Sequence, residues 1–410
     1  MIVSDISVQG PRLSATVAWE DNDRPPQSIW FDIPEAPPAL SAEAFLVACA
    51  MPAMRDREKR LRIDAPVDPD LLDSIPAALL WRMEAHGYEY PPPALEAPGK
   101  TGVPDKRGLP AAGMLSCGID SLAMFRLNLQ RYHQDHPRRL RLGVVVKGFD
   151  APQQFEATQA AARRIGGCLG IDVISVNTNI QELTKWPHPT RPLSVFWGRE
   201  WHGSAIASVA HTLTNRASLV SLASSGASLR LIRTQPWGSH PLFDPLFGSS
   251  AMPVYHENGA MPRLEKTRVV AEWEEGLRNL LVCTLWTRQV PNCGLCEKCM
   301  RTALALTILG RLDGSPFQNV PPTVEILRAV ELKNYYEAWY FEELVGPLAA
   351  AGRNDLARAT QGAVDRYRRR LRMGPMKERA KAFDRRYLGE MAVRTNRFAR
   401  RILLGPAARS

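Results

Sequence analysis

The start of the chain alternates apolar and polar residues with a period of two, in three short runs over residues 1–35. Turn-forming residues separate the runs, first Gly10-Pro11 and later Pro25-Pro26. A period of two puts every second side chain on one face of a strand, so this pattern predicts a small antiparallel meander. Ser41 then stands as the N-cap of a predicted helix, and Asp68-Pro69-Asp70 opens a second one.

Prolines gather between residues 91 and 110, beginning with Pro91-Pro92-Pro93. Proline removes a backbone donor and interrupts both helices and central strands. We therefore place a linker here and a domain boundary near residue 100. Residues 1–100 are expected to form a small N-terminal α+β domain.

From residue 109 onward, short apolar runs alternate with segments of helical periodicity. This alternation predicts an α/β domain over residues 101–312, with a parallel sheet and helices on both faces. Ligands of such sheets bind beyond the carboxyl ends of the strands. Residues 313–410 read as a helical extension. The predicted strands are 111–115, 142–146, 172–176 and 218–223, and the predicted helices are 121–132, 153–169 and 202–215.

The first strand of this domain runs directly into a short polar turn, which a helix follows. The turn reads Ser116-Cys117-Gly118-Ile119-Asp120-Ser121. Backbone N–H groups at such a turn and the dipole of the helix point at one place and favour an anion. Gly118 permits close backbone approach, the hydroxyls of Ser116 and Ser121 can donate to phosphate oxygens, and Asp120 can hold Mg²⁺ or cap the helix. An ordinary strand–helix turn is the alternative.

Seven cysteines are present, and four of them lie within seventeen residues: Cys283, Cys293, Cys296 and Cys299. Four thiolates in one short loop suit tetrahedral Zn²⁺ and leave no open coordination position, so we expect a structural zinc site. Gly294 would relax the turn between the ligands. An iron–sulfur cluster and reduced cysteines without a metal are the alternatives.

The turn resembles the Ser-Gly-Gly-x-Asp-Ser signature of the PP-loop ATP pyrophosphatases. The order of later features is similar to that of the 7-cyano-7-deazaguanine synthases within that superfamily, over about residues 109–310. Gly148-Phe149-Asp150 ends the second strand, Trp201-His202-Gly203 opens a helix, and Lys266 precedes the cysteine cluster. One position departs from the signature: Cys117 stands where the family has glycine, and a left-handed backbone there would strain it.

The resemblance implies an adenine-nucleotide alpha-hydrolase-like fold and the use of ATP with Mg²⁺. ATP would adenylate a carboxylate, pyrophosphate would leave, and a nucleophile such as ammonia would displace AMP. Lys266 matches the family's late lysine, and it would neutralise charge on the leaving pyrophosphate; a solvated helix lysine is the alternative. The ATP-binding residues implied are Ser116, Cys117, Gly118, Ile119, Asp120, Ser121 and Gly148.

Two further features remain open on sequence alone. His240 and Asp244 lie where the synthases have a substrate-contacting loop, and by type they form an acid/base or substrate-binding pair. The surrounding residues differ from the family, so the deazaguanine substrate does not carry over. Cys117 sits at a helix N-terminus, where a thiol pKa falls, so it is either a nucleophile or a small tolerated residue.

The charge of the chain is concentrated at its end. The net charge is +10, yet residues 351–410 carry 17 Lys/Arg and 5 Asp/Glu, so the first 350 residues have a net charge of −2. A basic amphipathic helix is expected there, which would bind an anionic membrane surface, an acidic partner or the protein's own body. Its apolar face comprises Leu388, Met391, Thr395, Phe398 and Ile402. Its basic residues include Arg385, Arg386, Arg394, Arg397, Arg400 and Arg401.

Hydrophobic residues make up 45% and charged residues 23% of the chain, as in globular domains. No apolar run reaches the ~18 residues of a spanning helix, and the first residues lack a secretory pattern. A cytoplasmic protein is expected, either free or peripheral to the inner face of the membrane. Nucleic acid is a less favoured partner, because no aromatic-rich RNA module accompanies the basic residues.

Three functions fit the sequence. The first is an ATP-dependent, AMP-forming ligase or amidotransferase-like enzyme acting on a small carboxylate, which would be glycan-linked or lipid-linked if the basic tail serves the substrate. The second is thiolation of tRNA or a small molecule, which requires a sulfur-handling cysteine. The third is a zinc-stabilised scaffold that binds nucleotide without turnover.

Overall fold

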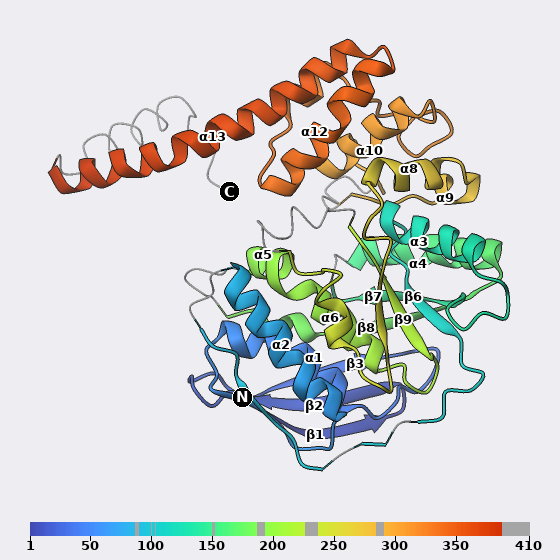
Figure 1. Ribbon diagram of the computed structural model, residues 1–410, viewed down its shortest axis with the longest axis vertical. Helices are drawn as coiled ribbons and strands as arrows, with labels where there is room; N and C mark the ends of the chain where they lie inside the picture. The colour runs from blue at the N-terminus through green and yellow to red at the C-terminus, as the bar shows by residue number, and fades with distance from the viewer. Residues whose placement is uncertain are drawn as a thin grey trace. The chain divides into compact units, whose positions relative to one another are not determined.

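The structure is a computed structural model that describes residues 1–86, 90–99, 101–102, 104–149, 152–186, 193–225, 237–283 and 291–387. Side chains in the last helix are described as far as Met373. The chain divides into two compact units, Met1–Pro321 and Pro322–Ser410. Figure 1 shows the elements of each unit.

Ten strands of the first unit form one sheet in the order β10-β9-β6-β7-β8-β3-β2-β1-β4-β5. The five strands from β10 to β8 are all parallel to one another, as the sequence predicts for this part of the chain. The strands are β1 (Ile2–Gln9), β2 (Arg12–Ala18), β3 (Gln27–Asp32), β4 (Arg60–Ile63), β5 (Ala94–Glu96), β6 (Ala111–Met114), β7 (Leu140–Lys147), β8 (Asp172–Thr178), β9 (Leu219–Ala223) and β10 (Val254–Glu257).

Helices cover both faces of this sheet, which confirms the predicted α/β architecture (Figure 1). On one face, α3 (Ile119–Arg131) approaches β6 so closely that a Cβ on Gly113 would lie 2.9 Å from Phe125. On the other face, α1 (Ala42–Arg55), α2 (Pro69–His86) and α6 (His202–His211) share one apolar core with the sheet. The helix α4 (Pro152–Leu169) lies against β7 and β8.

Within the described ranges, the remaining elements of the first unit are η1 (Ile180–Thr184), α5 (Leu193–Phe196), η2 (Trp197–Trp201), η3 (Asp244–Phe247), α8 (Arg263–Ala271), α9 (Glu274–Arg278) and α10 (Glu297–Ile308). The segment η2 is one turn of π-helix, a local geometry that is frequent at functional sites.

The N-terminal residues belong to the same sheet as the α/β region. Strand β3 pairs antiparallel with β8, with Phe31 opposite Thr178, and the Thr178 hydroxyl donates to the carbonyl of Trp30 at 2.8 Å. One continuous apolar core contains residues from both sides of the boundary expected near residue 100. Residues 1–100 and 101–312 therefore share one compact unit, which ends at Pro321.

Local sequence signals of the N-terminal region agree with the structure. The meander is present as β1, β2 and β3, and the Ser41 hydroxyl caps α1 by accepting from Ala44 N at 3.2 Å. Strands β4 and β5 were not predicted from the pattern, and β5 lies inside the expected linker. Both strands are short and pair in parallel with each other. Because they lie far apart along the chain, no local pattern predicts their pairing.

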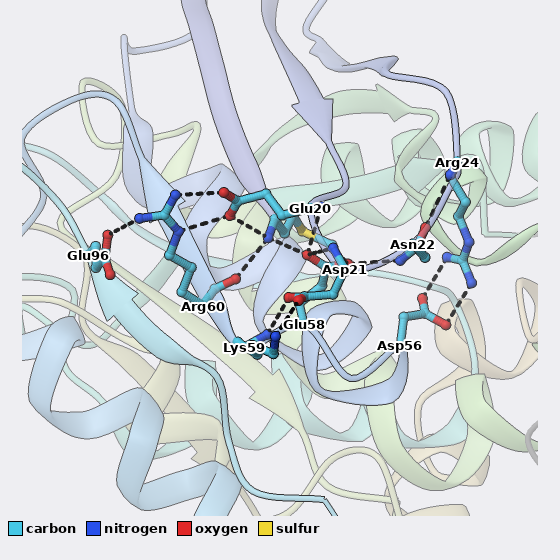
Figure 2. A network of polar contacts seen from close by, with 10 residues as sticks. Glu20, Asp21, Asn22, Arg24, Asp56, Glu58, Lys59, Arg60 and Glu96 are labelled. Carbon is cyan, nitrogen blue, oxygen red and sulfur yellow. Dashed lines mark hydrogen bonds and ion pairs between the residues drawn. The ribbon is translucent and has the colours of Figure 1, made fainter.

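A polar network ties the turn after β2 to the turn between α1 and β4 (Figure 2). The buried carboxylate of Glu58 accepts from the backbone N–H of Glu20 at 3.0 Å and from Asn22 Nδ2 at 2.8 Å. The guanidinium of Arg24 binds Asp56 with two hydrogen bonds of 2.8 and 2.9 Å. These contacts satisfy buried polar groups at the sheet's N-terminal region.

The second unit is helical, as predicted for residues 313–410. Its helices are α11 (Val324–Ala329), α12 (Tyr335–Ala350) and α13 (Asn354–Tyr387). Arg366 of α13 donates to the carbonyl of Leu327 at 2.8 Å, and Arg368 pairs with Glu342 at 2.7 Å. Several of the basic residues of α13 therefore serve packing inside this unit.

The predicted basic amphipathic helix lies largely outside the described residues. The helix α13 includes Arg385 and Arg386, of which only the backbone is described. The residues from Leu388 onward are not described. Within the described ranges, no helix combines the length and apolar character needed to cross a bilayer.

Candidate functional site

The polar turn after β6 lies where the strand order of the sheet reverses. From β6 the chain continues to β7 on one side, while β9 pairs with the other side of β6. Ligands of parallel sheets bind at such a switch point, beyond the carboxyl ends of the strands. Residues 116–121 therefore occupy the position where a ligand is expected, with Gly118 as the N-cap of α3.

Cys117 adopts the left-handed conformation, with a φ of 56°. This conformation favours glycine, the residue that the PP-loop signature has at this position. The Cys117 side chain is buried, and its Sγ lies 3.8 Å from the carbonyl oxygen of Thr158. Burial raises the pKa of the thiol to about 12. A buried, neutral thiol favours the interpretation of Cys117 as a small tolerated residue over that of a nucleophile.

The other residues of the turn arrange two hydroxyls beside the start of α3. The Oγ atoms of Ser116 and Ser121 lie 3.2 Å apart, and Ser121 Oγ also donates to the carbonyl of Gly118 at 3.2 Å. Ser116 is exposed, whereas Ile119 is buried and anchors the helix in the core. Ser116, Gly118 and Asp120 thus lie on the outer side of the loop, whereas the buried side chains of Cys117 and Ile119 pack it against the core.

A helix from a distant part of the chain brings two cations to this turn. Arg263 Nη1 lies 2.5 Å from Asp120 Oδ2, although the two residues are 143 positions apart. Lys266 Nζ lies 3.8 Å from Asp120 Oδ1 and donates to the carbonyl of Ser224 at 2.6 Å. The Lys266 side chain is 1% exposed, so it is not a solvated helix lysine. Burial lowers the pKa of Lys266 to about 8, while the charge of Asp120 opposes this shift.

Gly148 ends β7 at the same edge of the sheet, with a φ of 115°. A Cβ there would lie 2.0 Å from the carbonyl oxygen of Thr178, so only glycine fits. The next residue, Phe149, packs its ring 4.8 Å from that of Trp197 in η2. His202 lies 6.2 Å from Trp197 and 5.3 Å from Trp237, measured between ring centroids. Aromatic rings from three segments thus gather beyond β7.

Asp244 is fully buried and holds a second polar cluster together. It accepts hydrogen bonds from the Ser239 hydroxyl at 2.6 Å, from the backbone N–H of His240 at 3.0 Å and from His256 Nδ1 at 2.7 Å. Burial alone would raise the pKa of Asp244, but these hydrogen bonds and the charge of His256 outweigh burial and lower it. A Cβ on Gly203 would lie 2.8 Å from Asp244 Oδ1, which sets the carboxylate beside the start of α6.

The imidazole that hydrogen-bonds Asp244 belongs to His256, whereas His240 contributes its backbone. His240 Nδ1 accepts from the backbone N–H of Leu242 at 2.8 Å, and its ring packs 4.9 Å from Phe243. The His256 side chain is 3% exposed. Its Nε2 has no hydrogen-bond partner among the residues that the structure describes.

Four cysteines form a buried cluster that can hold a metal ion such as zinc. Their Sγ atoms all lie within 4.8 Å of one another. The hydrogen bond with Cys296 and burial raise the pKa of the Cys299 thiol, so four thiolates at this spacing need a cation. The backbone N–H of Cys296 donates to Cys293 Sγ at 3.3 Å, which stabilises a thiolate ligand. Gly294 has a φ of 70°, as expected for the turn. The cluster comprises Cys283, Cys293, Cys296 and Cys299.

The segment before Cys283 connects this cluster to the phosphate-loop candidate. The backbone N–H of Leu281 donates to the carbonyl of Cys117 at 2.8 Å. Asn292 accepts from the N–H of Val282 at 2.9 Å and donates to the carbonyl of Leu280 at 2.9 Å. A metal ion on the cysteines would therefore also fix the segment against which the turn at Cys117 rests.

Two residues of the site were missed by the sequence argument. Arg263 precedes Lys266 by three positions, so both lie on one face of a helix, and that spacing was the available signal. His256 lies in a short alternating run, Val254-Tyr255-His256-Glu257, and nothing in that run pairs it with Asp244. Comparison with protein-family models, curated protein sequences and solved structures finds no match to this chain. The fold and the site define an α/β protein with a mostly parallel sheet and a buried four-cysteine cluster.

Proposed function

We propose that the protein binds ATP with Mg²⁺ at residues 116–121 and uses it to adenylate a carboxylate. The observation that carries the proposal is the convergence of Lys266 on the turn that begins α3. Lys266 is buried, it lies 3.8 Å from Asp120, and it comes from a helix 143 or more positions away. A buried cation at a helix N-terminus favours a polyanion. The resemblance of the turn to the PP-loop signature supports ATP as the polyanion.

Each residue then has a role. The backbone of Gly118 and the hydroxyls of Ser116 and Ser121 bind phosphate oxygens, and Asp120 is the carboxylate for Mg²⁺. A carboxylate oxygen of the substrate attacks the α-phosphorus, the bond to the β-phosphate oxygen breaks, and pyrophosphate leaves beside Lys266. A nucleophile such as ammonia then attacks the acyl-adenylate and releases AMP. Gly148 keeps the end of β7 free of side-chain atoms. Zn²⁺ on the four cysteines supports the fold and takes no part in the reaction.

The test is isothermal titration of metal-assayed protein with a non-hydrolysable ATP analogue and Mg²⁺, beside the double variant Asp120→Ala, Ser121→Ala. Saturable binding that the variant loses supports the site. No binding to folded, zinc-loaded wild-type protein contradicts it. A pyrophosphate-release assay over a panel of carboxylates with ammonium then separates an enzyme from a non-catalytic scaffold, because the scaffold releases none.

Thiolation is a weaker candidate for this site. The only cysteine within the loop is Cys117, whose thiol is buried with its pKa raised to about 12. A sulfur carrier must expose a thiolate. If thiolation were nevertheless the reaction and Cys117 its sulfur carrier, Cys117→Ser would abolish turnover while leaving nucleotide binding. On the ligase proposal, Cys117→Ser keeps both.

A further inference from the structure

The two cations of α8 and the carboxylate of α3 form a compact triad that is mostly shielded from water. Arg263 and Lys266 are three positions apart and reach Asp120 at 2.5 and 3.8 Å. Side-chain exposures are 13% for Arg263, 1% for Lys266 and 21% for Asp120. Buried charges demand partners of opposite sign, so this arrangement is costly unless an anion completes it.

Arg263 and Lys266 bring two positive charges close to Asp120, and the N-terminus of α3 adds partial positive charge at the same place. Asp120 Oδ2 binds Arg263, while the buried Oδ1 has no hydrogen-bond partner within the described part of the chain. Two cationic side chains beside a helix N-terminus favour a ligand with several negative charges, and Asp120 Oδ1 can bind a metal ion that accompanies it.

Asp120 also faces two competing demands. A carboxylate that binds a divalent cation attracts a guanidinium less strongly, because the metal offsets its negative charge and the two cations repel each other. Arginine presents a planar fork that matches phosphate oxygens, whereas lysine acts as a point charge. When a phosphate chain with its metal arrives, exchange of partners lets Asp120 bind the metal and Arg263 bind the phosphate.

We infer that Arg263 is a second phosphate-binding residue, which takes the pyrophosphate portion of the nucleotide in exchange for Asp120. This inference rests on the proposed ATP site, and it adds a residue and an order of events to it. In the ligand-free protein, Asp120 forms an ion pair with Arg263. In the complex Asp120 turns to the divalent cation, and Arg263 and Lys266 hold the phosphate chain from one helix face.

The experiment titrates three probes, pyrophosphate, AMP-PNP and AMP, into the full chain with and without Mg²⁺, with zinc content checked before and after. Arg263→Ala should weaken the binding of pyrophosphate and AMP-PNP about tenfold or more, the loss typical of a charge-assisted hydrogen bond. Its affinity for AMP should be unchanged. The affinity of Arg263→Lys for pyrophosphate and AMP-PNP should fall between those of Arg263→Ala and the wild type. Arg268→Ala is the matched control, because Arg268 pairs with Glu265 on the exposed side of the same helix at 3.2 Å.

Asp120→Asn gives the sharpest result, since it removes the competing carboxylate. Without Mg²⁺ this variant should bind pyrophosphate about tenfold more tightly than wild type, and added Mg²⁺ should strengthen binding only in the wild type. Weaker pyrophosphate binding by Asp120→Asn without Mg²⁺ would overturn the exchange. Wild-type affinity in Arg263→Ala would overturn the role of Arg263 while leaving the ATP site intact. If wild-type protein with Mg²⁺ binds none of the probes, the proposed function itself fails.

Discussion

Burial pushes two bases near the site toward their neutral forms, to different extents. The pKa of Lys266 falls to about 8, so most of its ammonium remains charged near pH 7. The pKa of His202 falls to about 4, chiefly through burial, with the charges of Arg82 and Lys298 acting in the same direction. Its Nδ1 hydrogen-bonds the carbonyl of Trp197 at 3.0 Å. Lys266 can therefore neutralise the charge of a phosphate group, whereas His202 stays neutral among the aromatic rings beyond β7.

The His202 shift predicts a loss of stability in acid. The unfolded chain binds a proton near pH 6.5 and the folded protein only near pH 4, so the stabilisation is complete above 6.5 and is lost as pH falls through 4. Between pH 7 and 4 the wild type should lose on the order of 2 kcal/mol more than His202→Gln. Urea unfolding of both proteins across this range measures the difference. Parallel pH profiles would mean that His202 has its ordinary pKa.

At the residue scale, the sequence could identify groups whose role is local. The strained position of Cys117 follows from the signature, and its φ of 56° confirms the expectation. The burial of its thiol could not be predicted, because it depends on Thr158 of α4. Pairing of Asp244 with His256 depends likewise on how η3 docks against β10. The sequence instead favoured His240, the nearer histidine along the chain.

At the element scale, the close approach of the chain after β7 to the end of β8 allows no side chain at Gly148. The methyl group of an alanine there would clash with the Thr178 carbonyl, and its backbone would have a φ that L-residues rarely adopt. Gly148→Ala should therefore lower the free energy of unfolding by about 3 kcal/mol or more. The matched control is Gly167→Ala in α4, where a Cβ meets nothing within 4 Å. Alanine in a helix should stabilise the protein by roughly 0.5–1 kcal/mol. Chemical denaturation of both variants checks the pair, and equal effects would contradict the close approach.

Elements with strong local signals were predicted, and those that depend on distant partners were not. The strands and helices from β6 to β9 follow from periodicity, and Ser41 marks the start of α1. The joining of β3 to β8 rests on two residue pairs nearly 150 positions apart, for which the meander carries no signal. The proline-rich stretch suggested a domain boundary, yet it contains β5 and connects strands of one sheet.

At the scale of the whole unit, the cysteine cluster and the phosphate-loop candidate share one segment. Leu281 bonds to Cys117, and Cys283, two positions later, belongs to the cluster. On the proposed function, a metal ion on the cysteines would therefore affect both stability and nucleotide binding. It would do so without contacting the nucleotide, as expected for a site with four protein ligands.

Removal of this metal should lower both properties together. Treatment with a strong chelator should release about one zinc per chain, lower the thermal midpoint by about 5 °C or more, and weaken AMP-PNP binding. Cys296→Ser should have the same effects, whereas Cys168→Ser, which alters an exposed cysteine outside the cluster, should have neither. An unchanged midpoint after complete metal removal would contradict the structural role, and iron with sulfide in place of zinc would contradict the choice of metal.

The most direct test of the proposed ATP site compares two lysines with similar chemistry that lie at different edges of the sheet. Burial lowers the pKa of both Lys266 and Lys106 to about 8. Lys106 bonds to the carbonyl oxygens of Thr214 and Ala217, ahead of β9 and at the opposite edge from the turn. The measurement is calorimetric titration of AMP-PNP with Mg²⁺ into Lys266→Met, Lys106→Met and wild type. We expect Lys266→Met to bind about tenfold or more weakly and Lys106→Met to match wild type. Equal affinity of Lys266→Met and wild type would contradict the account.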